Sequence, residues 1–379
     1  MKILQIGKFY SPAKGGIETV VKTLAQGLQA HGQEVSVLCA NQGAHSVEEE
    51  VENIPVRRLA CYGKWFSQPL TPSLGWTLRQ LSQEFDLFHL HLPNPLAEFF
   101  ALFLPTHLPL VATYHADVTR QQLLLPLYLP LLRRFLHRTR KIIVPTQSHI
   151  DYSPVLSPWP KKQVSVIPFG ISNPFRSVAR DELAAQLQQR HGRFALFVGR
   201  HVEYKGIAYL IEAMERISQQ NTSLRLVILG DGPLRSELTL LVKQRGLDSR
   251  IHLQAQVSQD LELQAHYQAC EFLVLPSVSR EEAFGMVLLE AMSFGKPLIS
   301  TQLNTGIREI NLDGVTGRTV PPRDAAALAQ AMLYLHQSES IRQTLGQAAQ
   351  ARFLEYFTDQ AMTRSHLQLY SDVLARNSS

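Results

Sequence analysis

The sequence is poor in the features that mark disulfide-rich and membrane-spanning proteins. It has only three cysteines, Cys39, Cys61 and Cys270, which are far apart and form no Cys-x-x-Cys pair. This pattern favours reduced thiols in a cytoplasmic protein over a disulfide framework. No apolar run reaches about twenty residues, so no transmembrane helix is expected. The apolar start of the chain is too short for a secretory signal.

Several common catalytic motifs are missing as well. No two aspartates are separated by a single residue, so the Asp-x-Asp form of a metal–diphosphate site is absent. The chain also contains no His-Glu-x-x-His, no P-loop and no Gly-x-Gly-x-x-Gly. We therefore expect no bound metal, no nucleoside triphosphatase and no nicotinamide- or flavin-dependent dehydrogenase.

What the sequence does contain is typical of a well-folded globular protein with two domains. Its 379 residues exceed the size of one ordinary core, and 45% are hydrophobic against 18% charged. The net charge of +5 is a modest excess. It suits an anionic substrate or an anionic membrane surface, and we expect no nucleic-acid partner.

Short apolar segments alternate with helical patterns, which indicates parallel sheets built from β–α–β units. In the first half, strands are predicted at 2–7, 35–39, 87–90, 110–114, 141–145 and 163–168, with a helix at 18–31. A segment at 169–178 has the Gly, Pro and Ser content of a hinge. In the second half, strands are predicted at 194–199, 224–230, 251–253, 272–276, 297–300 and 317–320, with helices at 206–219, 234–245 and 261–269.

This doubling predicts an α/β fold with two Rossmann-like domains facing each other across a central cleft. Ligands are expected at the carboxyl ends of the strands. We place the first domain at 1–170 and the second at 171–356. A helix at about 357–379 is expected to pack back on the first domain.

The most specific pattern is Glu-Ala-Phe-Gly-Met-Val-Leu-Leu-Glu, from Glu282 to Glu290, followed by Ala-Met and Gly-Lys-Pro. It follows a predicted strand, so a loop leads into a helix whose first N–H groups can bind phosphate. Gly285 allows the backbone to approach a diphosphate closely. The two glutamates can each accept hydrogen bonds from hydroxyls. The alternative is a solvated carboxylate pair beside a buried helix.

With this motif, nearly the whole chain resembles the family-4 retaining glycosyltransferases of GT-B fold, which include phosphatidylinositol and O-antigen mannosyltransferases. The resemblance implies that Glu282 contacts the donor sugar and Glu290 the nucleotide ribose. It also implies that Gly285, Met286 and Val287 offer backbone amides to the diphosphate.

A second pattern, Gly-Arg-His-Val-Glu-Tyr-Lys-Gly, begins at Gly199, where a predicted strand ends. Arg200 supplies a planar fork for phosphate oxygens, and Lys205 supplies a compact positive charge. Two surface cations with no ligand would give the same spacing. The resemblance implies instead that both residues clamp the diphosphate and stabilise the leaving nucleoside diphosphate.

The first β–α loop carries a third pattern, Lys-Gly-Gly-Ile-Glu, from Lys14 to Glu18. Adjacent glycines before a helix can bring backbone amides to a phosphate or sugar oxygen, although a plain tight turn has the same sequence. In similar enzymes this loop lies over the donor phosphate and near the acceptor. Gly15 and Gly16 are therefore candidate donor-binding residues, and Glu18 could face acceptor hydroxyls.

Tyr-His-Ala-Asp at the end of another predicted strand provides the last candidate, His115. It could donate a hydrogen bond to a sugar hydroxyl, or steady positive charge through its backbone carbonyl. A capped strand end is the alternative, since the chain has 14 histidines. The family often carries a histidine beside the donor sugar here, so His115 is the catalytic candidate. For His89 and His91 a structural or acceptor-side role is favoured.

The resemblance implies metal-independent, same-face transfer in which the donor phosphate accepts the acceptor's proton. GDP-mannose is the favoured donor, although UDP-sugars fit the same loops and the base-binding wall, expected near 253–260, does not separate them. The expected acceptor is an oligosaccharide, such as a glycan on polyprenyl diphosphate, in bacterial surface polysaccharide synthesis. A non-catalytic nucleotide-sugar-binding partner in an assembly complex is the alternative from another class.

The leucine- and arginine-rich segment 118–140 bears on where the protein acts. It could lie in a membrane interface, with arginines on lipid phosphates, or form a core helix with a basic exposed face. The expected location is cytoplasmic, with peripheral contact at the inner face of the membrane under the first alternative.

Overall fold

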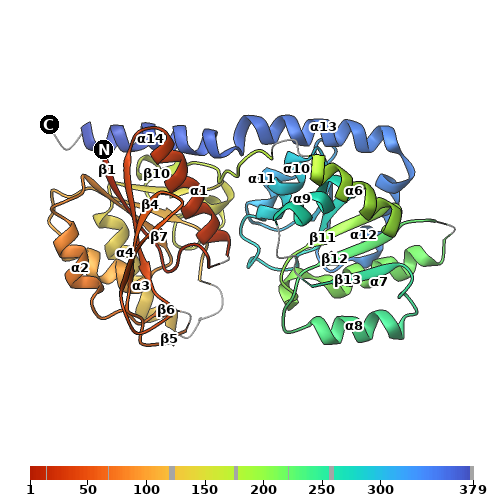
Figure 1. The fold of residues 1–379 in the computed structure, drawn as a ribbon, viewed down its shortest axis with the longest axis horizontal. Coiled ribbons are helices and arrows are strands. Elements are labelled where there is room, and N and C mark those ends of the chain that lie inside the picture. The colour runs from red at the N-terminus through yellow and green to blue at the C-terminus, as the bar shows by residue number, and fades with distance from the viewer. Residues whose placement is uncertain are drawn as a thin grey trace. The chain divides into compact units, whose positions relative to one another are not determined.

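Two separate sheets organise the chain, each in its own unit (Figure 1). The computed structural model describes residues 1–13, 15–66, 68–118, 124–174, 178–220, 222–255 and 260–375. The first unit comprises Met1–Ser172 and Phe357–Ser379, and the second comprises Asn173–Tyr356. Within the described ranges, no helix has the length and apolar character needed to cross a bilayer.

The first unit contains an eight-stranded sheet in the order β10-β9-β8-β7-β1-β2-β4-β3 and a short β5–β6 hairpin. Its elements are β1 Lys2–Ile6, α1 Gly16–Ala30, β2 Glu34–Ala40, β3 Val47–Val51, β4 Ile54–Leu59, β5 Lys64–Trp65, β6 Gln68–Pro69, α2 Leu74–Leu81, β7 Leu87–Leu92, α3 Pro95–Ala101, β8 Leu110–Tyr114, α4 Leu125–Arg138, β9 Lys141–Val144, α5 Ser148–Asp151, a 3₁₀ turn Lys161–Gln163, β10 Val164–Val166 and α14 Asp359–Ala375.

The second unit contains a six-stranded parallel sheet in the order β13-β12-β11-β14-β15-β16. Its elements are α6 Val178–His191, β11 Phe194–Val198, a 3₁₀ turn Glu203–Lys205, α7 Ile207–Ser218, β12 Arg225–Leu229, α8 Arg235–Gln244, β13 Ile251–Gln254, α9 Asp260–Ala269, β14 Phe272–Leu275, α10 Met286–Ser293, β15 Leu298–Thr301, α11 Ile307–Ile310, β16 Gly317–Val320, α12 Ala325–Gln337 and α13 Glu339–Tyr356.

Both sheets have the doubly wound strand order, which confirms the predicted α/β class with two Rossmann-like domains. Numbered within its unit, the second sheet runs 3-2-1-4-5-6, and the first follows the same order apart from its two edge strands, β3 and β10. The order reverses between β1 and β7 and again between β11 and β14. A crevice forms at such a reversal because the connections leave on opposite faces of the sheet, so each unit has one favoured ligand position.

The central strands are covered on both faces, which explains why they read as continuous apolar runs. All six residues of β7 are buried, including the polar His89 and His91. The edge strand β3 differs, because it pairs antiparallel with β4 and carries three consecutive glutamates. No strand is predicted there from the sequence, since a charged edge strand lacks the apolar pattern of a buried one.

The C-terminal helix α14 belongs to the first unit, where it packs on α1 (Figure 1). The two helices approach closely at Gly27, where an added Cβ would lie 2.1 Å from Thr363 Oγ1. A residue with a side chain at position 27 would therefore push α14 away. The close approach brings the buried face of α14, including Tyr370, against the sheet.

Candidate functional site

The donor-site candidates of the second unit gather at the carboxyl edge of its sheet. Arg200 and Lys205 follow β11, whereas Glu282 follows β14. These two strands are paired in parallel, with Leu196 opposite Leu273. The residues that the sequence analysis selected from separate motifs thus flank the point where the strand order reverses.

Lys205 and Glu282 form a buried ion pair. Lys205 Nζ lies 2.5 Å from Glu282 Oε2, and the two side chains are 10% and 9% exposed. Ser277, at the end of β14, donates a second hydrogen bond to the same carboxylate oxygen over 2.8 Å. Burial alone would lower the pKa of Lys205, but the charge and hydrogen bond of Glu282, together with the charges of Tyr204 and Glu290, outweigh it and raise the pKa. Lys205 is therefore a fixed positive charge, as neutralising a leaving diphosphate requires.

The helix α10 presents its amino end at the same edge. Gly285 caps it at φ +83°, a conformation that a residue with a side chain rarely adopts. Met286 and Val287 occupy the first turn, where backbone N–H groups have no acceptor within the helix. This arrangement supplies oriented donors and the positive end of a helix dipole to an anion.

Glu290 lies one turn further along α10 and is half-buried. Tyr267 of α9 donates a hydrogen bond to Glu290 Oε2 over 2.5 Å. Burial raises the pKa of Glu290, and the hydrogen bond from Tyr267 opposes that shift. Sequence reasoning missed Tyr267 and Ser277. Ser277 directly follows the buried strand and could have been noticed, whereas nothing in the sequence relates Tyr267 to Glu290.

Arg200 differs from Lys205 because its side chain is exposed. Its long fork can therefore reach a ligand without first breaking a buried contact. Of the predicted base-binding wall, 256–259 lie outside the described residues. The same holds for Lys14 of the glycine loop and for 175–177 of the predicted hinge.

In the first unit, the glycine loop lies between β1 and α1. Gly15 and Gly16 are exposed, and Gly15 precedes the first turn of α1 without a side-chain cap. Glu18 extends beside this loop, since a Cβ on Gly15 would lie 2.2 Å from its Oε2. Burial raises the pKa of Glu18, and nearby Lys8 lowers it in part. The loop thus offers backbone amides next to a carboxyl group.

Sequence reasoning missed a buried acid in the same region, Glu98 of α3. Its Oε1 accepts hydrogen bonds from the Asn94 backbone N–H (2.7 Å) and from the Tyr128 hydroxyl (2.8 Å). Its Oε2 has no partner in the described part of the chain. Burial raises the pKa of Glu98 to about 7. Lys8 lies near enough to oppose this shift, and burial lowers the pKa of Lys8 itself.

His115 is buried directly after β8 and stacks on Phe169, with ring centroids 4.8 Å apart. Its Nε2 lies 2.9 Å from His91 Nδ1. Burial, with smaller contributions from His149 and His366, lowers the pKa of His115 to about 3. The ring is therefore neutral at physiological pH.

His89 and His91 are fully enclosed, so the structure gives them internal hydrogen bonds instead of an acceptor-side surface. His89 lies 2.6 Å from the Tyr370 hydroxyl and 2.7 Å from Thr113 Oγ1. His91 lies 2.8 Å from Gln5 Oε1. Of the two roles considered for this pair, the structural one fits.

An apolar cavity of about 310 Å³ lies at the carboxyl edge of the first sheet. Pro93 and Pro95 after β7, Trp65 and Phe66 of the hairpin, and several leucines of α4 line it. Lys8 is its only charged lining residue among those described. The cavity therefore fits the apolar part of a ligand with an anionic group.

The segment 118–140 is described from 124 onward, with Val118 before the gap; 119–123 lie outside the described residues. Its helix α4 buries Leu132, Phe135 and Leu136 in the core of the first unit. Arg133 and Arg134 are exposed, and Leu127 is 79% exposed. From Leu125 to Arg138 the segment is thus a core helix with a basic outer face.

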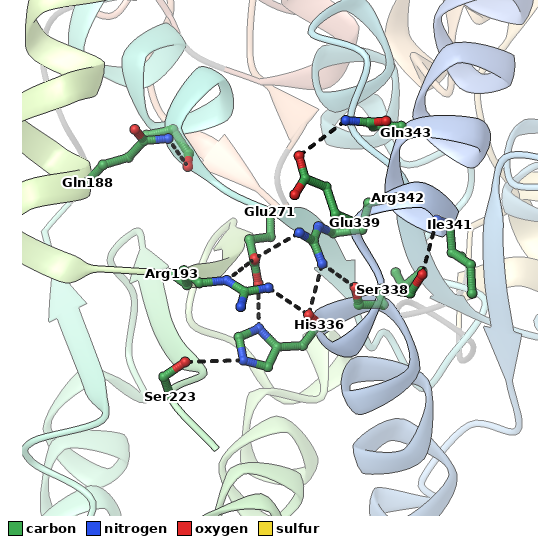
Figure 2. Close-up of polar contacts among 12 residues, drawn as sticks. Gln188, Arg193, Ser223, Glu271, His336, Ser338, Glu339, Ile341, Arg342 and Gln343 are labelled. Carbon is green, nitrogen blue, oxygen red and sulfur yellow. Dashed lines mark hydrogen bonds and ion pairs between the residues drawn. The ribbon is translucent and has the colours of Figure 1, made fainter. Parts of the chain in front are cut away.

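A second charged cluster occupies the opposite, amino-terminal edge of the second sheet (Figure 2). Glu271 precedes β14 and binds Arg193 (2.6 Å), His336 (2.5 Å) and Arg342 (3.3 Å). Burial raises the pKa of Glu271, but hydrogen bonds from His336 and Arg193 outweigh it and lower the pKa. A cavity of about 560 Å³ lies beside this cluster.

Among the described residues, no three His, Cys, Asp or Glu side chains gather as a metal site. Comparison with known proteins identifies the family.

Residues 14–173 match Glycosyltransferase Family 4, and residues 179–352 match Glycosyl transferases group 1. The chain is 32% identical to O-antigen chain mannosyltransferase C of Escherichia coli, covering 100% of both proteins. It is 33% identical to the D-rhamnosyltransferase WbpZ of Pseudomonas aeruginosa, covering 94% of this chain and 92% of that one. The crystal structure of Anabaena Alr3699/HepE in complex with UDP has a TM-score of 0.79 at 20% identity, covering 98% and 100%.

The chain therefore belongs to glycosyltransferase family 4. It is a glycosyltransferase of a retaining family, and its two units have the GT-B fold. Enzymes of this family take the sugar from a nucleotide-sugar donor without a metal ion. The family, the fold and the enzyme class inferred from the sequence are confirmed.

Proposed function

We propose that this enzyme transfers mannose from GDP-mannose to a lipid-linked or oligosaccharide acceptor in bacterial surface polysaccharide synthesis. The observation that carries the proposal is similarity to an O-antigen chain mannosyltransferase, at 32% identity over the whole of both chains. The similar rhamnosyltransferase makes a 6-deoxyhexose the alternative sugar. UDP-sugars remain the alternative donors.

In this proposal the diphosphate is held by Lys205, Arg200 and the first turn of α10. Glu282 accepts a hydrogen bond from the sugar, and Glu290 accepts one from the ribose. Lys205 supports the assignment because it uses only one of three N–H donors on Glu282 among the described contacts. A phosphate oxygen can take another. As the sugar–phosphate bond breaks, these fixed charges stabilise the negative charge that develops on the leaving group.

Glu282 is held by Lys205 and Ser277 through a single oxygen, which leaves its other oxygen available to a sugar hydroxyl. For His115, the proposal rests on the family resemblance and on the placement of its ring within the first unit. The glycine loop of Gly15 and Gly16 is assigned to the donor phosphate on the same resemblance, and Glu18 to acceptor hydroxyls.

The donor is tested by thermal shift of the purified protein with GDP, UDP, ADP and TDP, each with and without EDTA. A ligand at 100 times its Kd stabilises the folded state by about 2.7 kcal/mol, which raises Tm by roughly 5 to 10 °C for a domain of this size. We expect this rise with GDP alone, unchanged by EDTA, and lost in Lys205→Met. A rise with UDP alone would favour UDP-sugars, and no rise with any of the four would contradict the proposed diphosphate site.

The sugar is then tested by comparing transfer from GDP-mannose and GDP-rhamnose. A site that hydrogen-bonds the 6-hydroxyl rejects the deoxy sugar strongly, since the buried polar group is left unpaired. We expect mannose to be transferred at least tenfold faster. The reverse preference would place this enzyme with the rhamnosyltransferase.

The apolar cavity beside Lys8 supports a lipid-linked acceptor such as a glycan on polyprenyl diphosphate. Its lining of leucine, proline and aromatic side chains suits a hydrocarbon chain and offers few groups to bind sugar hydroxyls. The test uses Leu127→Glu, which places a charge at the cavity wall on an exposed position. Transfer to a prenyl-diphosphate-linked acceptor should fall, while transfer to the same glycan without lipid should not. Equal effects on both acceptors would contradict the lipid assignment.

The same acceptor would place the enzyme at the inner face of the cytoplasmic membrane. The exposed arginines of α4 are the proposed contact with lipid phosphates. Binding of the wild-type protein to vesicles with and without anionic lipid, compared with an Arg133→Gln/Arg134→Gln variant, tests this contact. Loss of binding only in the variant would support it, and equal binding of both proteins would contradict it.

A further inference from the structure

A continuous chain of buried hydrogen bonds connects His115 to the C-terminal helix within the first unit. His115 Nε2 lies 2.9 Å from His91 Nδ1, and His91 Nε2 lies 2.8 Å from Gln5 Oε1. Gln5 Nε2 donates to the Tyr370 hydroxyl over 3.3 Å. His115 directly follows β8, the others come from β7, β1 and α14, and each is at most 5% exposed.

The direction of each hydrogen bond follows from Gln5. A carboxamide oxygen only accepts, so His91 Nε2 must carry the proton that it shares with Gln5 Oε1. A neutral imidazole has one N–H, and the unprotonated Nδ1 of His91 is therefore an acceptor. His115 Nε2 lies against this acceptor and must carry a proton of its own.

The contacts on the other side of Gln5 agree with this orientation of its amide. Its NH₂ group faces Tyr370, whose hydroxyl donates in turn to His89 Nδ1 over 2.6 Å. His89 Nε2 then donates to Thr113 Oγ1 over 2.7 Å. Every member of the chain thus has a donor or acceptor role that agrees with its neighbours, as a buried polar network requires.

From this geometry we infer that Gln5 and Tyr370 are positioning residues that hold His115 as its Nε2–H tautomer, with an unprotonated Nδ1 for a hydroxyl of the donor sugar. In the described part of the chain, His115 Nδ1 has no protein partner. The ring can then accept a hydrogen bond from the sugar but cannot donate one. Donation from this histidine was one expectation from the sequence, and the network assigns the hydrogen bond the opposite direction.

The inference rests on the proposed role of His115 toward the donor sugar, but the tautomer is a property of the free enzyme. Burial that lowers the pKa of His115 to about 3 supports a neutral ring. The chain also gives α14 a role in the site, since Tyr370 acts on His115 only through Gln5 and His91.

The tautomer is measured directly in full-length protein labelled with ¹⁵N-histidine. A long-range ¹H–¹⁵N spectrum at neutral pH distinguishes a protonated ring nitrogen from a bare one, and His115→Gln assigns the signal. We expect a single His115 form with protonated Nε2 and bare Nδ1. A protonated Nδ1, a doubly protonated ring or a mixture in the wild type would overturn the inference.

Gln5→Leu removes the acceptor that sets the direction, so His115 should become a mixture of tautomers. We expect kcat to fall about tenfold, which equals about 1.4 kcal/mol, with KM for the donor nearly unchanged. Tyr370→Phe should give a smaller fall in the same direction. Unchanged kcat in Gln5→Leu despite a mixed ring would overturn the catalytic part of the inference.

Val373→Ala is the matched control, because Val373 is a buried apolar residue of α14 outside the chain of hydrogen bonds. It should lower stability while leaving the His115 spectrum and kcat unchanged. If Val373→Ala alters both as strongly as Gln5→Leu, the effect is one of packing and the inference is wrong. Absence of transferase activity in the wild type would refute the proposed function, whereas the spectrum would still decide the tautomer.

Discussion

Two buried carboxylates lie at opposite edges of the second sheet, and both come beside β14. Glu271 precedes the strand, Glu282 follows it, and each side chain is 9% exposed. Glu271 binds two arginines and a histidine, whereas Glu282 binds one lysine and one serine. Both acids have basic partners in the fold, and neither burial nor charge distinguishes them.

The partners of Glu271 have further partners of their own. Arg193 also donates to the His336 carbonyl over 2.7 Å, and Arg342 donates to the Leu335 carbonyl over 2.7 Å. Figure 2 shows the contacts around Glu271. Lys205, by contrast, keeps unused donors beside the open first turn of α10. A buried charge beside the open first turn of a helix at a carboxyl edge indicates a ligand site, whereas charges that bind one another and main-chain carbonyls at the other edge indicate a structural site.

Removing the positive charge of Lys205 at the carboxyl edge of the second sheet should have the largest effect on activity. Lys205→Met is expected to lower kcat about 100- to 1,000-fold, because a fixed charge that stabilises the leaving group is lost. Steady-state kinetics with a nucleotide-sugar donor measures this effect. Arg193→Met is the matched change at the other edge and should retain kcat within about twofold of wild type. Equal losses in the two variants would end the distinction between the clusters.

Glu271→Gln should act on stability instead. It leaves two arginines and a histidine without their shared carboxylate, which costs about 3 kcal/mol and lowers Tm of the second unit by roughly 10 °C. Its kcat should stay near that of wild type at low temperature. All three tryptophans lie in the first unit, so their fluorescence transition should not move while the circular dichroism transition does.

The free energy of unfolding of the second unit should depend on pH in the direction that Glu271 sets. Because its pKa is lowered in the folded state, its stabilisation is fully present above its unfolded value of about 4.3. The stabilisation is lost as the pH falls from there through the folded pKa. Urea unfolding at pH 7 and pH 4 should show this loss in the wild type and a smaller one in Glu271→Gln. An equal loss in both proteins would assign the acid sensitivity to other carboxyl groups.

Glu98 in the first unit provides the opposite case, a buried acid with too few partners. Its folded pKa of about 7 exceeds the unfolded value, so ionisation opposes folding as the pH rises from about 4.3 to 7. Glu98→Gln should therefore raise stability by about 1 to 2 kcal/mol at pH 8 and change little at pH 4.5. Tryptophan fluorescence during urea unfolding at both pH values measures this change in stability. A loss of stability at pH 8 would mean that the ionised carboxylate has a favourable partner, with Lys8 the nearest candidate.

The smallest effect is expected at Glu290. Tyr267→Phe removes the hydroxyl that donates to Glu290, which should weaken the ribose contact by about 1 kcal/mol. KM for the donor should rise about fivefold, with kcat unchanged. A fall in kcat at constant KM would instead place Glu290 in the chemical step.

The sequence predicted the strands that are buried and apolar and failed for those that are not. The strand Leu110–Tyr114 was predicted with its observed ends, because both of its faces are covered. The strand Val47–Val51 was missed, since its outward face carries glutamates. The hairpin at Lys64–Pro69 was missed because two-residue strands leave no period to detect.

For the site, motifs at strand ends selected Lys205 and Glu282 separately, 77 residues apart. Their pairing follows only from the strand order, which places β14 beside β11. Gln5 and Tyr370 are 365 residues apart, and neither lies in a recognisable motif. Contacts of this kind depend on which helix covers which strand, so side-chain chemistry alone could not predict them.

The position of α14 has a consequence for how the protein is made on the ribosome. The first unit draws its last helix from the end of the chain, after the whole of the second unit. At synthesis rates of about 5 to 20 residues per second, roughly 200 residues separate Ser172 from the end of α14, a delay of about 10 to 40 seconds. During that interval the nascent first unit exposes the sheet and the α1 surface that α14 later covers. The second unit, whose residues are contiguous, can fold first although it is translated later.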